Sequence, residues 1–434
     1  MNVSIVTLFP ELYQSFLQTS LMQKAVDKQL LSFSLKTVFE HVQPKERVDA
    51  PTFGHSSGML LRPDVMEKAF DDLDGAHGKS FKIFLSPQGT RLTQRSAKDL
   101  WSKIESYDHV MFVASRYEGV DARVEQEYAD AIVSVGDFVV MGGDIPTMLL
   151  MECLFRHMPG VVGKQESVDL DSFSGAFVDH PEYTKPVEWK NRVVPEILRS
   201  GNHAAIIDWR RHKAAELTVK KHFDWLRSCL LSCEDQALAK RYIPSHYVAL
   251  MHDGIALKEG RIGTTSVTSI DIHDIARSSA TYNLKNYFVV TPLVDQQKMV
   301  ETILGFWSDK QVGAEYNKHR HEALDSVMLK PSLQAVLEQI EQQEGKKPII
   351  IGTSARFDQN MDKLISYHDQ SLVWQHDRPV LLLLGTGHGM AQDLLDQCDY
   401  FLQPLQGFSN FNHLSVRSAA AIIFDKWLGF DIRR

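Results

Sequence analysis

The amino-acid sequence predicts an α/β protein in which parallel strands alternate with amphipathic helices. In the first half, short apolar runs are separated by amphipathic stretches such as residues 11–28 and 93–107, and this alternation is typical of βαβ units. Glycine-containing loops follow several of these runs, and open α/β sheets gather their ligand sites in such loops. The predicted strands are residues 3–8, 31–37, 82–85, 109–114 and 131–135.

The second half predicts a small helical domain followed by another α/β segment. After Gly175 the strand pattern stops, and a helical run over residues 204–230 follows Ser200-Gly-Asn-His203 with no strand between them. Residues 309–317 predict a surface loop, and the acidic run 338–344 predicts a solvated helix. Strand patterns return at residues 247–250, 287–290, 348–351 and 379–384. We therefore expect domains over residues 1–165, 166–240 and 245–434, the middle one formed by a linker and the helices.

Composition argues against several classes of protein. At 434 residues, the chain is longer than a single core usually grows, which supports several domains. The apolar run at residues 3–8 is too short for a signal sequence or a membrane span, so a cytoplasmic protein without a membrane partner is predicted. The four cysteines lack metal-ligand spacing and no acidic cluster demands a metal, so no metal site is predicted, although magnesium stays possible.

The charge balance excludes a general polyanion binder. The formal net charge is −8, whereas sequence-independent binding of nucleic acid relies on many Lys and Arg contacts to phosphate. Any nucleic acid must therefore be bound by a local cluster of basic residues. Basic clusters at residues 210–213, 220–222 and 318–321 are candidates, and each can also be explained as a solvated helix face.

Three loops of the first half predict one shared ligand site. Ser86-Pro-Gln-Gly89 and Arg116-Tyr-Glu-Gly119 each follow a predicted strand, and residues 134–148 run from a strand through Gly142-Gly143 into an apolar helix. Each motif alone is typical of a turn, but three such loops after neighbouring strands favour a common cradle. A similar passage at residues 399–423 indicates a second module.

These motifs carry a resemblance to a known family over nearly the whole chain. Residues 1–235 resemble the bacterial tRNA (guanine-N1)-methyltransferases of the TrmD type, and residues 245–434 resemble a second RNA methyltransferase domain of the SPOUT superfamily. The first match rests on Ile5-Val-Thr-Leu-Phe-Pro-Glu11, the three loops above, Asp171-Ser-Phe173, His180-Pro-Glu-Tyr-Thr-Lys-Pro186 and Ser200-Gly-Asn-His203. The second rests on Asp271-Ile-His-Asp-Ile-Ala-Arg277, Thr353-Ser-Ala-Arg356, Gly385-Thr-Gly-His-Gly389 and Asn412-His-Leu-Ser-Val-Arg-Ser418.

The resemblance implies two SPOUT domains, each an α/β fold with a deep trefoil knot, and a helical RNA-binding domain between them. It also implies that S-adenosylmethionine is bound largely by backbone groups of the knot loops, where glycines permit close approach. Carried over residue by residue, the first cofactor site comprises Leu85, Ser86, Pro87, Gln88, Gly89, Ser115, Arg116, Tyr117, Glu118, Gly119, Val135, Gly136, Asp137, Val140, Gly142, Gly143 and Pro146.

The implied reaction is methyl transfer to N1 of the guanine just 3′ of a tRNA anticodon. Asp171 matches the family's catalytic aspartate and would remove the N1 proton, and Arg156 would stabilise negative charge on O6. An ordinary aspartate has a pKa of about 3.9 and is a weak base, so burial is expected to raise the pKa of Asp171. From the residues alone, Asp171 could also be a helix N-cap, and Arg156 an exposed arginine at a helix end.

The tRNA would be bound by its anticodon stem-loop, whose bases can leave their stack. In the family the helical domain reaches the knot of a second subunit, so a homodimer is implied. The substrate-binding residues implied are Gly58, Glu118, Asp179, His180, Arg210 and Arg211.

The sequence departs from the family pattern at several positions. The family's Gly-Gly-Gly-X-Gly-Met is Gly54-His-Ser-Ser-Gly-Met59 here, and its Ser-Gly-Gly-Glu is Met141-Gly-Gly-Asp144. The family's glycine before Arg-Tyr-Glu-Gly is Ser115, and its tryptophan is His388 in the second module. These changes leave an alternative open, an RNA-binding protein with a degenerate first site.

The C-terminal domain is predicted to hold a second cofactor cradle. Its substrate stays open, because no aspartate there matches a known base as Asp171 does; it could act on another RNA or serve for cofactor binding or dimerisation. The residues of this cradle are Gly385, Gly387, Gly389, Leu402, Leu405, Gly407 and Leu414.

Overall fold

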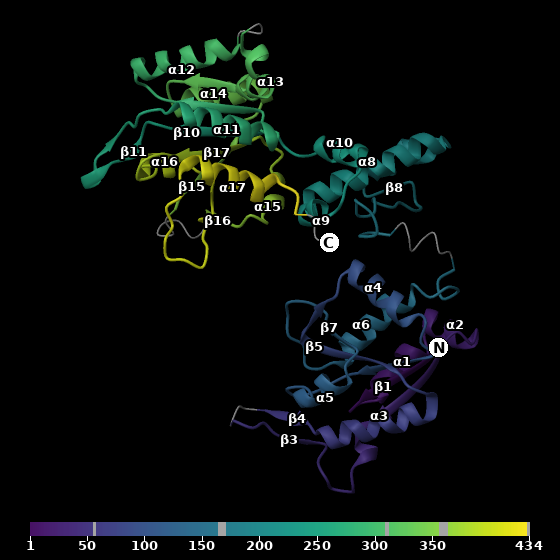
Figure 1. The fold of residues 1–434 in the computed structure, drawn as a ribbon. Coiled ribbons are helices and arrows are strands. Elements are labelled where there is room, and N and C mark those ends of the chain that lie inside the picture. The colour runs from purple at the N-terminus through teal and green to yellow at the C-terminus, as the bar shows by residue number, and fades with distance from the viewer. Residues whose placement is uncertain (55–57, 164–170, 309–311, 356–362, 432–434) are drawn as a thin grey trace. The chain divides into compact units, whose positions relative to one another are not determined.

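The computed structural model describes residues 1–54, 58–163, 171–308, 312–355 and 363–431. It forms two compact units, Met1–Ser174 and Gly175–Arg434 (Figure 1). Throughout the described ranges, no helix has both the length and the apolar character needed to cross a membrane.

The first unit is built on a parallel sheet with the strand order β2-β1-β6-β5-β7. Neighbouring residues along a strand face opposite sides, so Ile5 packs in one core cluster and Val6 in another. Burial on both faces is typical of parallel sheets and confirms the predicted α/β class. The strands are β1 (Asn2–Thr7), β2 (Ser32–Thr37), β5 (Phe81–Arg91), β6 (His109–Val113) and β7 (Ala131–Ser134).

Helices cover both faces of this sheet. Leu150 and Phe155 of α6 lie in the same cluster as Ile5, and Phe70 of α3 lies in the cluster of Val6. A short antiparallel pair, β3 (Asp49–Pro51) with β4 (Met59–Leu61), stands beside the sheet. The helices are α1 (Glu11–Leu17), α2 (Ser20–Asp27), α3 (Pro63–His77), α4 (Gln94–Ile104), α5 (Ala122–Tyr128) and α6 (Asp144–Phe155).

Two predictions for the first unit were wrong in detail. The single helix expected over residues 11–28 is divided between α1 and α2, because Thr19 is extended and Ser20 has a φ of 47°. Strand β5 does not end before the Ser86-Pro-Gln-Gly89 loop but continues to Arg91. Both Leu85 and Thr90 are paired with Val133, so residues 86–89 form a bulge within β5.

The second unit contains a longer parallel sheet with the order β14-β13-β10-β17-β15-β18-β16. Strands β14 and β16 were not predicted, since each is short and follows no clear alternating pattern, whereas β18 is the strand expected at the start of the passage over residues 399–423. The strands are β10 (His246–Met251), β13 (Asn286–Val290), β14 (Val327–Lys330), β15 (Ile349–Thr353), β16 (Leu364–Ile365), β17 (Val380–Gly385) and β18 (Tyr400–Leu402), with a separate pair β11 (Ile255–Ala256) and β12 (Ile262–Gly263).

The two sheets share one topology. The first unit has the order β2-β1-β6-β5-β7, and the central strands of the second have the order β13-β10-β17-β15-β18. In each set, the second strand along the chain lies at one end, followed by the first, the fourth, the third and the fifth. Strand β17 of the second unit therefore corresponds to β6 of the first, and β18 corresponds to β7. The loops that follow them can be compared directly.

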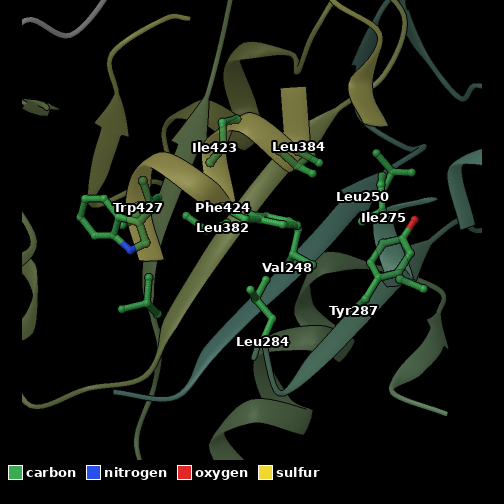
Figure 2. Close-up of a cluster of buried hydrophobic side chains, with 14 of the residues drawn as sticks. Val248, Leu250, Ile275, Leu284, Tyr287, Leu382, Leu384, Ile423, Phe424 and Trp427 are labelled. Carbon is green, nitrogen blue, oxygen red and sulfur yellow. The ribbon is translucent and has the colours of Figure 1, made fainter. Parts of the chain in front are cut away.

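Helices also cover the second sheet. Figure 2 shows Ile423, Phe424 and Trp427 of α17 beside strands β10 and β17 in one buried cluster. Residues 312–316 are helical and open α13 rather than forming the predicted surface loop, whereas Asn317, with a φ of −161°, interrupts that helix; residues 309–311 lie outside the described ranges. The helices are α11 (Ser269–Thr281), α12 (Val294–Ser308), α13 (Val312–Leu324), α14 (Leu333–Glu344), α15 (Gln370–Trp374), α16 (Gln392–Leu395) and α17 (Val416–Leu428).

The helical segment packs directly on this second sheet domain. Phe223 meets Trp374 with ring centroids 4.6 Å apart, and Arg227 donates to the carbonyls of Asp425 and Lys426 at the end of α17. These contacts explain why both segments fall in one unit. The predicted helical run is divided at His222, whose backbone is not helical. The segment comprises the hairpin β8 (Glu188–Trp189) and β9 (Arg192–Val193) and helices α8 (His203–Lys221), α9 (Phe223–Ser228) and α10 (Cys233–Lys240).

Candidate active site

The Arg116–Gly119 loop makes a tight turn at the carboxyl end of β6. Tyr117 has a φ of 57° and Gly119 a φ of 110°, and the amide of Gly119 donates to the carbonyl of Arg116 at 3.0 Å. A positive φ is uncommon for a tyrosine, so this backbone is held in place by its surroundings. The Tyr117 side chain is exposed.

The β5 bulge lies against the neighbouring strand and close to this turn. A Cβ atom on Gly89 would stand 2.4 Å from the carbonyl carbon of Ile132, so only glycine fits there. The hydroxyl of Ser115 donates to the carbonyl of Leu85 at 3.4 Å and links the bulge to the second loop. Pro87 and Gln88 at the tip are exposed, which leaves the bulge open to a ligand.

The Gly142-Gly143 turn completes the cradle. The amide of Gly143 donates to the carbonyl of Ser115 at 2.7 Å, and a Cβ on Gly143 would lie 2.8 Å from the Ser115 nitrogen. A Cβ on Gly142 would collide with the Arg116 side chain. The glycines are therefore required by close backbone approach, and the three predicted loops meet at one edge of the sheet.

A buried carboxylate holds this arrangement together. Asp144 is fully buried at the start of α6 and accepts hydrogen bonds from Arg116 Nε at 2.6 Å, from the Thr7 hydroxyl at 2.5 Å and from the Tyr13 hydroxyl at 3.1 Å. Burial, with Asp144 close by, raises the pKa of Tyr13 far above its usual range. The sequence pattern singled out Asp144 only as a departure from the family. Its place at the start of an apolar helix, directly after two glycines, was the available signal.

The remaining residues of the predicted first cofactor site differ in whether they are buried or exposed. Pro146 is buried in the first turn of α6, and Val135 packs against the core beside the cradle. Gly136 has a φ of 155°, and a Cβ there would meet the Phe138 ring. Asp137 instead points to the surface, where Arg91 Nη1 lies 3.1 Å from its carboxylate, and Val140 is exposed.

The two predicted catalytic residues are brought together. Arg156 follows the last residue of α6, and its guanidinium donates to the carboxylate of Asp171. Residues 164–170, between them, lie outside the described ranges. Each side chain is 37% exposed, so the burial expected for Asp171 is not supplied by the described residues of a single chain.

The hairpin β3–β4 contacts the Arg116–Gly119 loop. The amide of Glu118 donates to the carbonyl of Met59 at 3.1 Å, and a Cβ on Gly58 would stand 2.3 Å from Cγ of Glu118. These contacts place two predicted substrate residues, Gly58 and Glu118, side by side. Residues 55–57, which carry most of the family departure here, lie outside the described ranges.

The other predicted substrate residues belong to the second unit. His180 lies 3.6 Å from Asp179 and 3.5 Å from Glu182. Arg210 lies 3.7 Å from Glu182. Arg211 lies 2.9 Å from Asp235 and 3.4 Å from Glu234. Each of the two arginines predicted to contact tRNA therefore already has a carboxylate beside it.

The second unit contains a turn with the same geometry as the Arg116–Gly119 loop of the first unit. Gly387 has a φ of 58° and Gly389 a φ of 101°, and the amide of Gly389 donates to the carbonyl of Thr386 at 2.9 Å. This is the turn of Arg116–Gly119, built on the corresponding strand β17, with glycine in place of Tyr117. The exposed His388 takes the place of Glu118.

The other residues of the predicted second cradle follow β18. Leu402 ends that strand and is buried, Leu405 packs against the core, and Leu414 is exposed. The side-chain amide of Asn412 donates to the carbonyl of Ala355 at 3.0 Å, which joins this loop to the end of β15. A Cβ on Gly385 would stand 2.8 Å from Cγ of Met390, whereas Gly407 has open space around it. Arg356 lies outside the described ranges.

The described residues contain no recognisable metal site. Among these residues no group of three or more His, Cys, Asp or Glu side chains is placed to hold a metal ion.

Comparisons with known proteins agree with this geometry. Residues 1–228 match the family described as tRNA (Guanine-1)-methyltransferase TrmD, and residues 245–429 match the family described as SAM-dependent RNA methyltransferase. A tRNA (guanine-N(1)-)-methyltransferase of Nitratidesulfovibrio vulgaris is 37% identical over 99% of both chains, and one of Oleidesulfovibrio alaskensis is 36% identical over 99% of both. The enzyme of that name from Bacillus subtilis is 36% identical over 52% of this chain and 93% of its own. The chain therefore belongs to the tRNA (guanine-1)-methyltransferase family, with a second RNA methyltransferase domain behind the first.

Proposed function

We propose that this enzyme transfers a methyl group from S-adenosylmethionine to N1 of the guanine just 3′ of the anticodon of a tRNA. The observations that carry the proposal are the meeting of three glycine-dependent loops at the start of α6 and the Arg156–Asp171 pair at the other end of that helix. When bound, the cofactor supplies a methyl group on a positively charged sulfur. The residues that would hold it are the β5 bulge, the Arg116–Gly119 turn and the Gly142-Gly143 turn.

Asp171 is the base of the proposed reaction. Neutral guanine carries a proton on N1, so its lone pair is free to attack only when that proton leaves and charge moves to O6. Asp171 would accept the proton as N1 forms its bond to the methyl carbon. General-base help of this kind is typically worth about 10²- to 10⁴-fold in rate.

Arg156 would stabilise the negative charge on O6. In the structure its guanidinium is bound to Asp171, which keeps that carboxylate close to a cation before substrate arrives. A guanidinium has several donors, so one can stay on the carboxylate while another turns to O6. This arrangement would orient the base and stabilise the product of deprotonation together.

We infer that the active form is a homodimer. A row of apolar side chains in and after the third loop is exposed, namely Phe138, Val139, Val140, Met141 and Ile145. A contiguous apolar surface of this kind is typical of a protein interface. The incomplete burial of Arg156 and Asp171 also fits a site that a second subunit completes.

We further propose the finer architecture implied by the family. Each sheet domain would contain a trefoil knot, and the chain would divide functionally at residues 1–165, 166–240 and 245–434. The shared strand order and the repeated turn at Thr386–Gly389 support a second cofactor cradle in the last segment. A tRNA substrate implies a cytoplasmic location.

The test is nucleoside analysis by mass spectrometry. A tRNA transcript with guanosine 3′ of the anticodon is incubated with S-adenosylmethionine and the full chain, and N1-methylguanosine at that position is the expected product. Asp171→Asn should lower kcat by at least about 100-fold and leave cofactor binding unchanged. Asp99→Asn, which removes an exposed carboxylate of α4, is the control. Unchanged turnover of Asp171→Asn contradicts its role as the base.

A further inference from the structure

A groove with aromatic and cationic walls lies at the β8–β9 hairpin of the second unit. It has a volume of about 430 Å³ and is lined by residues 183–187, by Trp189 and by residues 192–194. That space is large enough for one nucleotide. None of the residues predicted from sequence to bind substrate lines it.

The hairpin fixes the position of its side chains. Lys190 and Asn191 both have positive φ values, 50° and 61°, which is the geometry of the two-residue turns that join twisted strands. The Val194 amide donates to the Val187 carbonyl at 2.9 Å, and Trp189 is paired with Arg192 across the strands. The aromatic ring and the guanidinium therefore rise from neighbouring positions on a defined backbone.

Two aromatic rings of the groove are open to solvent. Trp189 is 59% exposed and Tyr183 is 47% exposed. The Lys190 ammonium lies 4.8 Å from the centre of the Trp189 ring. Tyr183 also contacts Trp209 of α8, with ring centroids 6.2 Å apart. Exposed aromatic rings beside cations are typical of proteins that bind single-stranded nucleic acid.

The cations at the groove are not neutralised. Within the described residues, no carboxylate lies within 4 Å of Lys185, Lys190 or Arg192, so no ion pair is formed there. On α8, in contrast, Arg211 lies beside Asp235, and Lys213 and Lys220 both contact Glu216. Lys185, Lys190 and Arg192 are thus available to phosphate.

We propose that this groove binds one unstacked nucleotide of the tRNA, with its base on Trp189 and its flanking phosphates at Lys185 and Arg192. The inference rests on the proposed function for the identity of the RNA. The chemistry of the walls favours RNA over a peptide or a second copy of the chain, because a stacking ring and unpaired cations are combined in a space of nucleotide size. Binding there would hold the tRNA while another of its bases reaches the catalytic cradle.

The test compares variants of the full chain in tRNA binding and in catalysis. Trp189→Ala should raise the Kd for the tRNA transcript by about 5- to 150-fold, the range of one base–aromatic stack. Its kcat at saturating tRNA and its affinity for S-adenosylmethionine should stay unchanged. Trp189→Phe should restore most of the binding, since it retains a stacking face. Phe306→Ala, which removes an exposed ring of α12, is the matched control.

Removing one positive charge gives an independent readout. Arg192→Gln should lower the slope of log Kd against log salt by about 0.7, the value for one phosphate contact on a single strand. Lys79→Glu, at an exposed position of the first unit, should leave tRNA affinity nearly unchanged. Photo-crosslinking of 4-thiouridine-labelled tRNA should label a peptide within residues 183–194.

The outcomes separate this inference from the proposed function. If the wild-type protein forms N1-methylguanosine but Trp189→Ala binds tRNA within twofold of wild type, the groove is not a nucleotide site. If the wild-type protein binds tRNA without forming N1-methylguanosine, the proposed function fails, and a weakened Trp189→Ala still supports the groove. If Trp189→Ala changes the sedimenting mass of the free protein and leaves tRNA affinity intact, the groove is a contact between subunits and the inference is overturned.

Discussion

Replacing Asp144 by asparagine should loosen the whole cofactor cradle. The Asp144 carboxylate is fully buried and accepts hydrogen bonds from Arg116, Thr7 and Tyr13. An asparagine of the same shape keeps one oxygen, but its NH₂ group must then face another donor. If it faces Arg116, two N–H groups oppose each other; if it faces Thr7 and Tyr13, their hydroxyls must turn away.

The expected loss of stability can be bounded from this geometry. Removing one partner of a buried ion pair costs about 3–5 kcal/mol. The Arg116 side chain is 21% exposed, and the asparagine oxygen retains one hydrogen bond. A loss of about 2–3 kcal/mol in the free energy of unfolding is therefore expected here. For a unit of the size of Met1–Ser174, this corresponds to a fall in Tm of about 5 to 10 °C.

The assay is thermal unfolding of the full chain, with cofactor titration beside it. The transition of the first unit should move down, while that of the second unit should stay in place because Asp144 has no part in it. The Kd for S-adenosylmethionine should rise by about tenfold or more, since the Arg116–Gly119 turn loses its anchor. Asp99→Asn, at an exposed position of α4, should change neither quantity. An unchanged Tm for Asp144→Asn, with unchanged cofactor affinity, would refute the view that this carboxylate organises the site.

Two further predictions concern the second unit. Phe223→Ala should destabilise it by about 3–5 kcal/mol in urea unfolding, because the ring is buried against Trp374 between the helical segment and the sheet domain. Leu230→Ala, at an exposed position of the same segment, should have little effect, and equal effects of both variants would contradict the packing described. Stability should also fall in acid: burial lowers the pKa of His246 to about 4, and its ring accepts from the Trp427 indole at 3.0 Å. Because the unfolded state binds this proton at a pKa near 6.5, the stabilisation is complete above pH 6.5 and falls by about 3 kcal/mol toward pH 4. Urea midpoints at pH 7.5 and 4.5 measure this, and His246→Gln should flatten the dependence; a wild-type midpoint that does not change with pH would exclude the neutral buried ring.

The strands of the first sheet could be predicted from the sequence because each is a continuous apolar run buried on both faces. Val3, Ile5 and Val6 all enter the core, so the signal does not depend on knowing which face is buried. The loops were recognised by their glycines, and the close contacts at Gly89 and Gly143 give the physical reason for those residues.

Features that depend on tertiary contacts could not be predicted. The bulge in β5 exists because Leu85 and Thr90 share the partner Val133 on another strand, and no local pattern records that pairing. Strand β16 has two residues and is stabilised by its pairing with β18. The sequence marked Asp144 only as a departure from the family pattern, and only the fold brings Thr7, Tyr13 and Arg116 to it.

The two cradles show how one backbone geometry can be held by different chemistry. In the first unit, the turn after β6 is anchored by an ion pair, Arg116 with the buried Asp144. In the second, the corresponding Thr386 hydroxyl lies 2.5 Å from the Thr265 hydroxyl and donates to the Met251 carbonyl at 3.0 Å. The positive φ values recur at the same two positions of each turn, so the dihedral pattern is a property of the shared strand order. The side chains around the two turns differ: Tyr117 is exposed in the first, whereas a Cβ on Gly387 in the second would stand 3.3 Å from Cγ2 of Ile255, and these side chains decide what each site can bind.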